Sequence, residues 1–146
     1  MSVQVKRPVA VGHAIAAGLL GAVLVDLFLI LSHQAPFPGI YQFVASGLVG
    51  QAAFTSSSYI VLGVILHLVI SIVWALLYAF VVTAMGRGKQ WVLDGAIFGV
   101  IVMIAMTGLL MAKGMGAAPT TGALIGSLIA HVVFFGWPVA WYYGRK

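Results

Sequence analysis

Four long apolar runs divide the chain, at about residues 9–31, 59–83, 91–112 and 122–143. The second run has 25 uncharged residues. As a helix it would extend roughly 37 Å, which exceeds the ~30 Å hydrocarbon core of a bilayer. The pattern predicts an all-α integral membrane protein, with a four-helix bundle that forms a single transmembrane domain over residues 1–146.

Small residues recur at intervals of four within these runs. The second run carries Gly63, Ser71, Ala75 and Ala79, with His67 in the same series. Equivalent series occur at Ala14, Gly18, Ala22 and Asp26, at Gly95 and Gly99, and at Gly122, Gly126 and Ala130. Residues four apart share one helix face, and in lipid a face of small side chains lets a second helix approach closely. These faces are therefore predicted to form the helix contacts, with Asp26 and His67 pointing into the bundle.

The first connection, residues 32–58, is the only long one. Pro36 and Pro38 exclude a continuous helix there. Residues 40–54 are too apolar for an ordinary loop and too short to span a membrane. One interpretation is a short helix that lies in the outer interface or re-enters the membrane, because Ile40, Phe43, Val44 and Leu48 would share one side. The other is an apolar loop packed over the end of the bundle.

A proline interrupts the fourth run after its midpoint. Pro138 has no N–H to donate to the carbonyl of Phe134, and its ring crowds that carbonyl. We therefore predict a bend in the fourth helix near Phe134.

The composition excludes several classes of protein. Of the 146 residues, 63% are hydrophobic and only 6% are charged, and the mean hydropathy is +1.17. Soluble domains contain about 25% charged residues, so a soluble domain is excluded. The absence of cysteine removes disulfides, thiolate metal sites and cysteine nucleophiles. The two acids, Asp26 and Asp94, lie in different runs at opposite depths, and no G-x-S-x-G is present. We predict a protein that is not an enzyme and holds no metal.

The net charge of +5 reflects membrane topology rather than nucleic acid binding. Six of the seven basic residues flank the runs at the two chain ends and in the second connection, as Lys6, Arg7, Arg87, Lys89, Arg145 and Lys146. Only Lys113 lies in the other connections. The positive-inside rule then places both termini in the cytoplasm. We expect a multi-pass protein of a bacterial inner membrane, in contact with lipid and with a membrane-protein partner or a second copy of itself.

Two histidines suggest an internal repeat. Aligning His67 with His131 places Gly63 against Ser127, although other positions match imperfectly. A parallel two-helix duplication is one interpretation, and chance similarity between apolar helices is the other. A real duplication would place both imidazoles at similar depth, facing a pseudo-two-fold axis along the membrane normal.

The candidate site is a buried polar cluster of Asp26, His67, Ser71, Ser127 and His131. Ionisable groups in transmembrane helices are costly to bury and usually face a partner or a cavity. Counting residues along each run places Asp26 and both histidines in the outer half of the bundle, within reach of one another. Each of these side chains comes from an apolar run.

Three functions fit such a cluster. The leading hypothesis is a non-enzymatic accessory or scaffold subunit in which the cluster fixes helix packing. In the second, His67 and His131 are the axial ligands of a b-type haem in an electron-transfer protein, which needs two imidazoles on facing helices. In the third, the cluster lines the path of a proton or small solute through a transporter or channel. Haem b is the one cofactor that the sequence suggests.

Overall fold

The computed structural model of the chain describes residues 9–35, 37–85, 90–115 and 120–144. Every element in these ranges is helical. They are α1 (Val11–Leu31), α2 (Gly39–Val49), the 3-10 segment η1 (Gly50–Phe54), α3 (Ser58–Ala84), α4 (Trp91–Ala112), α5 (Thr121–Ile129), the π-helical segment η2 (Ala130–Gly136) and α6 (Trp137–Gly144). Four helices are long and apolar enough to cross a membrane: α1, α3, α4 and the continuous α5–η2–α6. The predicted all-α fold with four such helices is confirmed.

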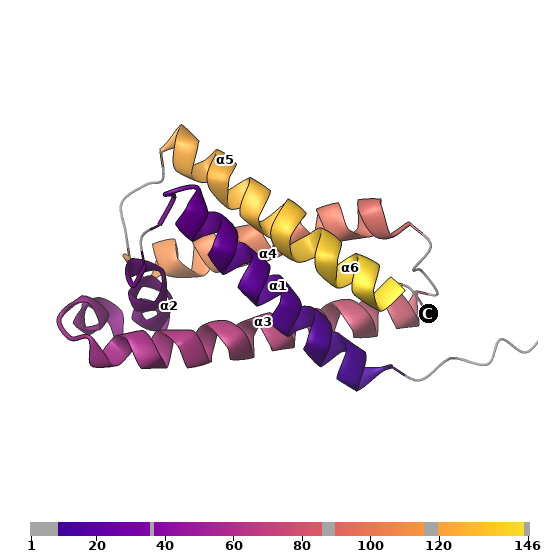
Figure 1. The fold of residues 1–146 in the computed structure, drawn as a ribbon, viewed down its shortest axis with the longest axis horizontal. Helices are drawn as coiled ribbons and strands as arrows, with labels where there is room; N and C mark the ends of the chain where they lie inside the picture. The colour runs from indigo at the N-terminus through magenta and orange to yellow at the C-terminus, as the bar shows by residue number, and fades with distance from the viewer. Residues whose placement is uncertain (1–8, 36, 86–89, 116–119, 145–146) are drawn as a thin grey trace, which may run out of the picture.

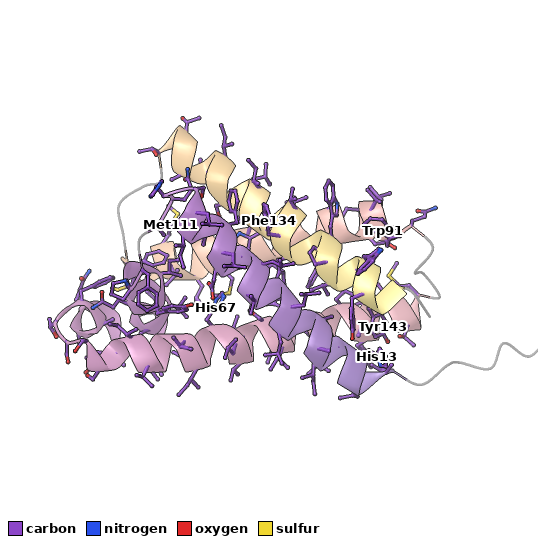
Figure 2. The ribbon with its side chains drawn as sticks, viewed as in Figure 1. His13, His67, Trp91, Met111, Phe134 and Tyr143 are labelled. Carbon is purple, nitrogen blue, oxygen red and sulfur yellow. The ribbon has the colours of Figure 1, made fainter. Side chains whose placement is uncertain are left out.

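The long helices alternate in direction along the bundle. In Figure 1, α1 and α4 run one way, while α3 and α5–α6 run the other way. The start of α1 and the end of α6 lie at the same end, which we call the terminal end; α2 lies at the opposite end, which we call the α2 end. His13, Trp91 and Tyr143 lie toward the terminal end (Figure 2). The six basic residues that carry the predicted orientation lie outside the described residues, so that orientation stays a prediction.

Small residues form the helix contacts, as predicted. A Cβ on Gly18 of α1 would meet the backbone of Ser71 in α3, and a Cβ on Gly99 of α4 would meet the backbone of His131 in η2. In lipid, such close backbone approach supplies the van der Waals contact that holds helices together. Gly122 is an exception, because it is exposed and no atom lies within 4 Å of its Cβ position. It lies in the first turn of α5, beyond the reach of the neighbouring helices.

The segment between α1 and α3 is helical, so the alternative of an apolar loop is wrong. Its buried residues are Ile40, Ala45 and Ser46, whereas Phe43 and Leu48 are exposed. Of the apolar side predicted for an interfacial helix, Phe43 and Leu48 point away from the bundle, and Ile40 is buried against it. The cause is a direct backbone contact, because Gly63 of α3 lies against the carbonyl of Tyr41 and fixes which side of α2 faces the bundle. Whether α2 lies in the interface or re-enters the membrane stays a prediction.

The irregularity in the fourth helix takes the form of a π-helix rather than a simple bend. It begins at Ala130, about a turn before the predicted position, and ends at Gly136, next to the Trp137-Pro138 pair. A π turn accommodates one extra residue, is frequent at functional sites and, like a proline, can kink a helix. The wider turn contains His131 and so alters the direction in which that side chain leaves the helix.

The contacts between the helices do not test the predicted duplication. In both halves the first long helix packs against the second, α1 on α3 and α4 on η2. Gly18 meets Ser71, whereas Gly99 meets His131, the residue aligned with His67. The two contacts thus fall one helical turn apart in the alignment. The duplication stays a prediction.

The two ends of the bundle interior differ in composition. Toward the terminal end, aromatic rings form the core, with Tyr78 and Phe98 at a centroid distance of 4.9 Å and Phe98 and Phe135 at 5.8 Å. Toward the α2 end, a cavity is lined by a few polar side chains among mostly apolar ones. The candidate site residues lie around this second region.

Candidate functional site

Three side chains from three helices meet beside this cavity, and we call them the Asp26 cluster: Asp26 of α1, Tyr41 of α2 and His67 of α3. The Tyr41 hydroxyl donates a hydrogen bond of 2.8 Å to Oδ2 of Asp26. Oδ1 of Asp26 lies 3.1 Å from Nε2 of His67, and the two side chains are 14% and 16% exposed. Figure 2 shows His67 between α3 and α1, inside the bundle.

The contact between Asp26 and His67 is close, but the two groups are not oriented for a hydrogen bond. Neither Oδ1 of Asp26 nor Nε2 of His67 has a hydrogen bond of good geometry among the described residues, although both atoms are buried. Two buried polar atoms at 3.1 Å attract each other electrostatically when the imidazole is protonated. The carboxylate therefore has one strong hydrogen bond, to Tyr41, and one electrostatic partner in His67.

Tyr41 is the member of this cluster that sequence reasoning missed. Its hydroxyl was visible within the apolar first connection, but nothing local predicts that α2 returns to α1. The position of Tyr41 depends on the contact between its backbone and Gly63, which joins residues 22 positions apart. A tyrosine in an otherwise apolar connection between two spans was the available signal.

The ionisation of Tyr41 offers a test of the cluster. Burial, the hydrogen bond to Asp26 and the charge of Asp26 raise the pKa of Tyr41 from 10.0 to about 12. Because this folded-state pKa lies above the unperturbed value, the associated stability is present below pH 10 and is lost as the pH rises through 12. We expect the tyrosinate absorbance to show one group titrating near pH 12 that Tyr41→Phe removes. If the group that Tyr41→Phe removes from the titration curve instead has a pKa near 10, the contact between Tyr41 and Asp26 is contradicted.

One ring nitrogen of His131 forms a hydrogen bond within its own helix. Its Nδ1 lies 2.8 Å from the carbonyl oxygen of Ser127, with the Ser127 hydroxyl at 3.4 Å. A carbonyl only accepts, so Nδ1 carries the proton that is donated to it. In the neutral ring, Nε2 then has a lone pair. Within the part of the chain that the structure describes, no hydrogen bond is made by this Nε2.

A cavity of about 290 Å³ lies between α1, α2, α3, α4 and α5–η2. Four of the five predicted site residues line it: His67, Ser71, Ser127 and His131. The remaining wall is mostly apolar and includes Ile70, Trp74, Val102, Met106 and Phe135. The structure therefore brings both imidazoles to one cavity. Asp26 lies behind His67 and is not among the lining residues, so it meets one imidazole and not the other.

A second hollow, of about 390 Å³, lies between α3 and α4 and is lined by residues of these two helices. It exists because α3 packs against α1 and α2, whereas α4 packs against η2 and α6. Buried Tyr78 and Phe98 form its floor, and exposed Leu77 and Ile101 form its rim. We call it the α3–α4 groove. Trp74 lines both the groove and the cavity.

Comparison with known proteins identifies a family but no activity. The family of unknown function DUF6789 matches residues 8–146, so the chain belongs to this family. No curated protein and no solved structure matches the chain. The function therefore has to be inferred from the geometry of the site.

Proposed function

We propose that this is a non-enzymatic membrane protein that binds a small, mostly apolar molecule in the cavity between His67 and His131. The observation that carries the proposal is the cavity of about 290 Å³, with apolar walls and a few converging polar groups. This combination is typical of small-molecule sites. A polar cluster that only fixed helix packing would need no cavity beside it. Atoms that line an empty cavity lose van der Waals contacts, which a ligand of matching shape restores.

The Asp26 cluster has a supporting part in this proposal. Ile40 and Val44 of α2 line the cavity at the α2 end. The hydrogen bond from Tyr41 to Asp26 holds α2 in place over this end. Lys113 adds a second attachment, because its ammonium group donates to the carbonyl of Gly47, also in α2. In this form of the accessory-subunit hypothesis, the protein holds a molecule taken from the bilayer.

The geometry gives less support to haem. A haem held by two histidines through Nε2 of each would need Nε2 of His67, which lies 3.1 Å from Asp26. Lys113, the one lysine or arginine among the described residues that could pair with a haem propionate, donates to the carbonyl of Gly47. Of the two imidazoles, His67 therefore has its Nε2 beside a carboxyl oxygen, whereas the described contacts of His131 are made by Nδ1. A Soret band in the purified protein that His131→Ala removes would replace our proposal by the haem hypothesis.

The geometry also gives less support to conduction. A route from the cavity toward the terminal end passes Trp74, whose ring contacts Phe98 edge-on at a centroid distance of 6.3 Å. Beyond these rings, the floor of the groove is the aromatic core around Tyr78. A chain of hydrogen-bonding groups for protons is interrupted at this layer. Proton flux in liposomes that is abolished by Asp26→Asn would favour the conduction hypothesis instead.

Ligand binding should stabilise the protein against heat. We expect a lipid extract of the membrane in which the protein is expressed to raise Tm by several degrees, because a ligand at 100 times its Kd adds about 2.7 kcal/mol. Thr107→Phe places a ring in the cavity and should abolish this shift. Ile104→Phe, a matched change on the exposed face of the same helix, should leave it unchanged. Equal Tm shifts in the wild type, Thr107→Phe and Ile104→Phe would show that the cavity is not the binding site.

A further inference from the structure

We propose that the ligand is a neutral amphipathic alcohol of the bilayer, whose hydroxyl donates to Nε2 of His131 and whose apolar tail lies in the α3–α4 groove. This inference rests on the proposed function. It adds the chemical class of the ligand and its direction in the site. It draws on three observations: the tautomer of His131, the charge of the cavity wall, and the position of Trp74 between the cavity and the groove.

The tautomer of His131 selects a hydrogen-bond donor. Because Nδ1 donates to the Ser127 carbonyl at 2.8 Å, the neutral ring offers a lone pair at Nε2. A ligand carbonyl or ether oxygen has no proton to give to that lone pair. A hydroxyl has one, and the Ser71 and Ser127 hydroxyls on the same wall can satisfy its oxygen.

The charge of the wall selects a neutral head group. Among the described residues that line the cavity, none is lysine or arginine. A phosphate or carboxylate would be buried there without a permanent counter-charge, which is strongly unfavourable in a medium of low dielectric constant. Asp26, the nearest acid, lies behind His67 and does not line the cavity, so a cationic head group would meet no carboxylate there either. A neutral hydroxyl is the head group that these surroundings accept.

Trp74 lies between the cavity and the groove. It lines both, so a molecule with its head beside His131 would pass this ring to place its tail between α3 and α4. The walls of the groove are apolar over Leu77, Phe98 and Ile101, and Asp94 lies in the first turn of α4 at the terminal end. The exposed rim faces lipid, which gives a route of entry from the bilayer.

A photoaffinity comparison tests this inference on the full chain. The probes are a long-chain primary alcohol with a diazirine near the end of its tail and the methyl ether of the same molecule. The alcohol is expected to label residues of the groove, with excess non-photoactive alcohol suppressing the labelling. The ether should label about tenfold less, because loss of one buried hydrogen bond of about 1.4 kcal/mol is a factor of ten. His131→Phe should equalise the two probes, and His13→Phe at the terminal end should not.

Each outcome decides one part of the proposal. Equal labelling by alcohol and ether in the wild type would overturn hydroxyl recognition, whereas a Tm shift with lipid extract would still support the proposed function. Labelling confined to lipid-facing positions outside the groove would overturn the assigned tail position. If His131→Phe fails to fold, the comparison of the two probes in the wild type remains decisive for hydroxyl recognition. Ile101→Trp, which narrows the groove, should reduce labelling by the alcohol independently of His131.

Discussion

Gly63→Ala is expected to separate α2 from α3 and to lower the free energy of unfolding by about 3 kcal/mol. A Cβ at this position would overlap the carbonyl group of Tyr41. The obstacle is backbone rather than the end of a flexible side chain, so α2 has to move as a unit. Thermal or denaturant unfolding in detergent measures the loss.

The matched control for Gly63→Ala is Gly108→Ala in α4. No atom lies within 4 Å of the Cβ position at Gly108. Alanine there should leave stability unchanged or raise it by about 0.5–1 kcal/mol, since glycine is unfavourable within a helix. Displacement of α2 also predicts that the pKa of Tyr41 falls from about 12 toward 10.0 in Gly63→Ala. Equal stability of the two variants, with no change in the Tyr41 titration, would contradict the observed packing of α2.

Asp26→Ala is expected to lower the free energy of unfolding by about 2–3 kcal/mol. The substitution leaves the Tyr41 hydroxyl without its acceptor and Nε2 of His67 without its electrostatic partner, and a buried polar group without a partner costs about 1–3 kcal/mol. Asp26→Asn keeps an oxygen for Tyr41 and should lose less. Unfolding of each variant in the same detergent supplies the comparison.

A double-mutant cycle with Tyr41→Phe isolates the hydrogen bond within the cluster. We expect a coupling energy of about 1–2 kcal/mol between Asp26 and Tyr41, because the two groups are in direct contact at 2.8 Å. Tyr59→Phe serves as the control substitution, because Tyr59 lies in the first turn of α3 and is not part of the Asp26 cluster. Effects of Asp26→Ala and Tyr41→Phe that simply add would show that the two side chains do not interact in the folded protein.

The sequence was sufficient for the parts of the fold that depend on local periodicity. Lipid requires each spanning segment to satisfy its own backbone hydrogen bonds, so length and apolarity alone located the four helices. The interval of four between Gly18 and Ala22, and between Gly95 and Gly99, identified buried helix faces for the same reason. These features are properties of one helix at a time.

The remaining features depend on contacts between distant segments. The buried face of α2 is set by Gly63, and the partner of Asp26 includes Tyr41, neither of which follows from the pattern within residues 40–54. The effect of Pro138 was expected, but the π-helical form and its start at Ala130 were not, because they depend on packing against α4. Likewise, depth counting placed His67 and His131 near each other, but the nitrogen that each presents depends on its hydrogen bonds.

Native mass spectrometry of the protein released from its own membrane would test the central claim most directly. If the cavity between His67 and His131 holds a bilayer molecule, the wild type and Ile104→Phe should carry one neutral, hydroxyl-bearing molecule per chain, and Thr107→Phe should carry none. The same non-covalent adducts on all three proteins, or no adduct on the wild type under conditions that keep it folded, would contradict the existence of a ligand in this cavity.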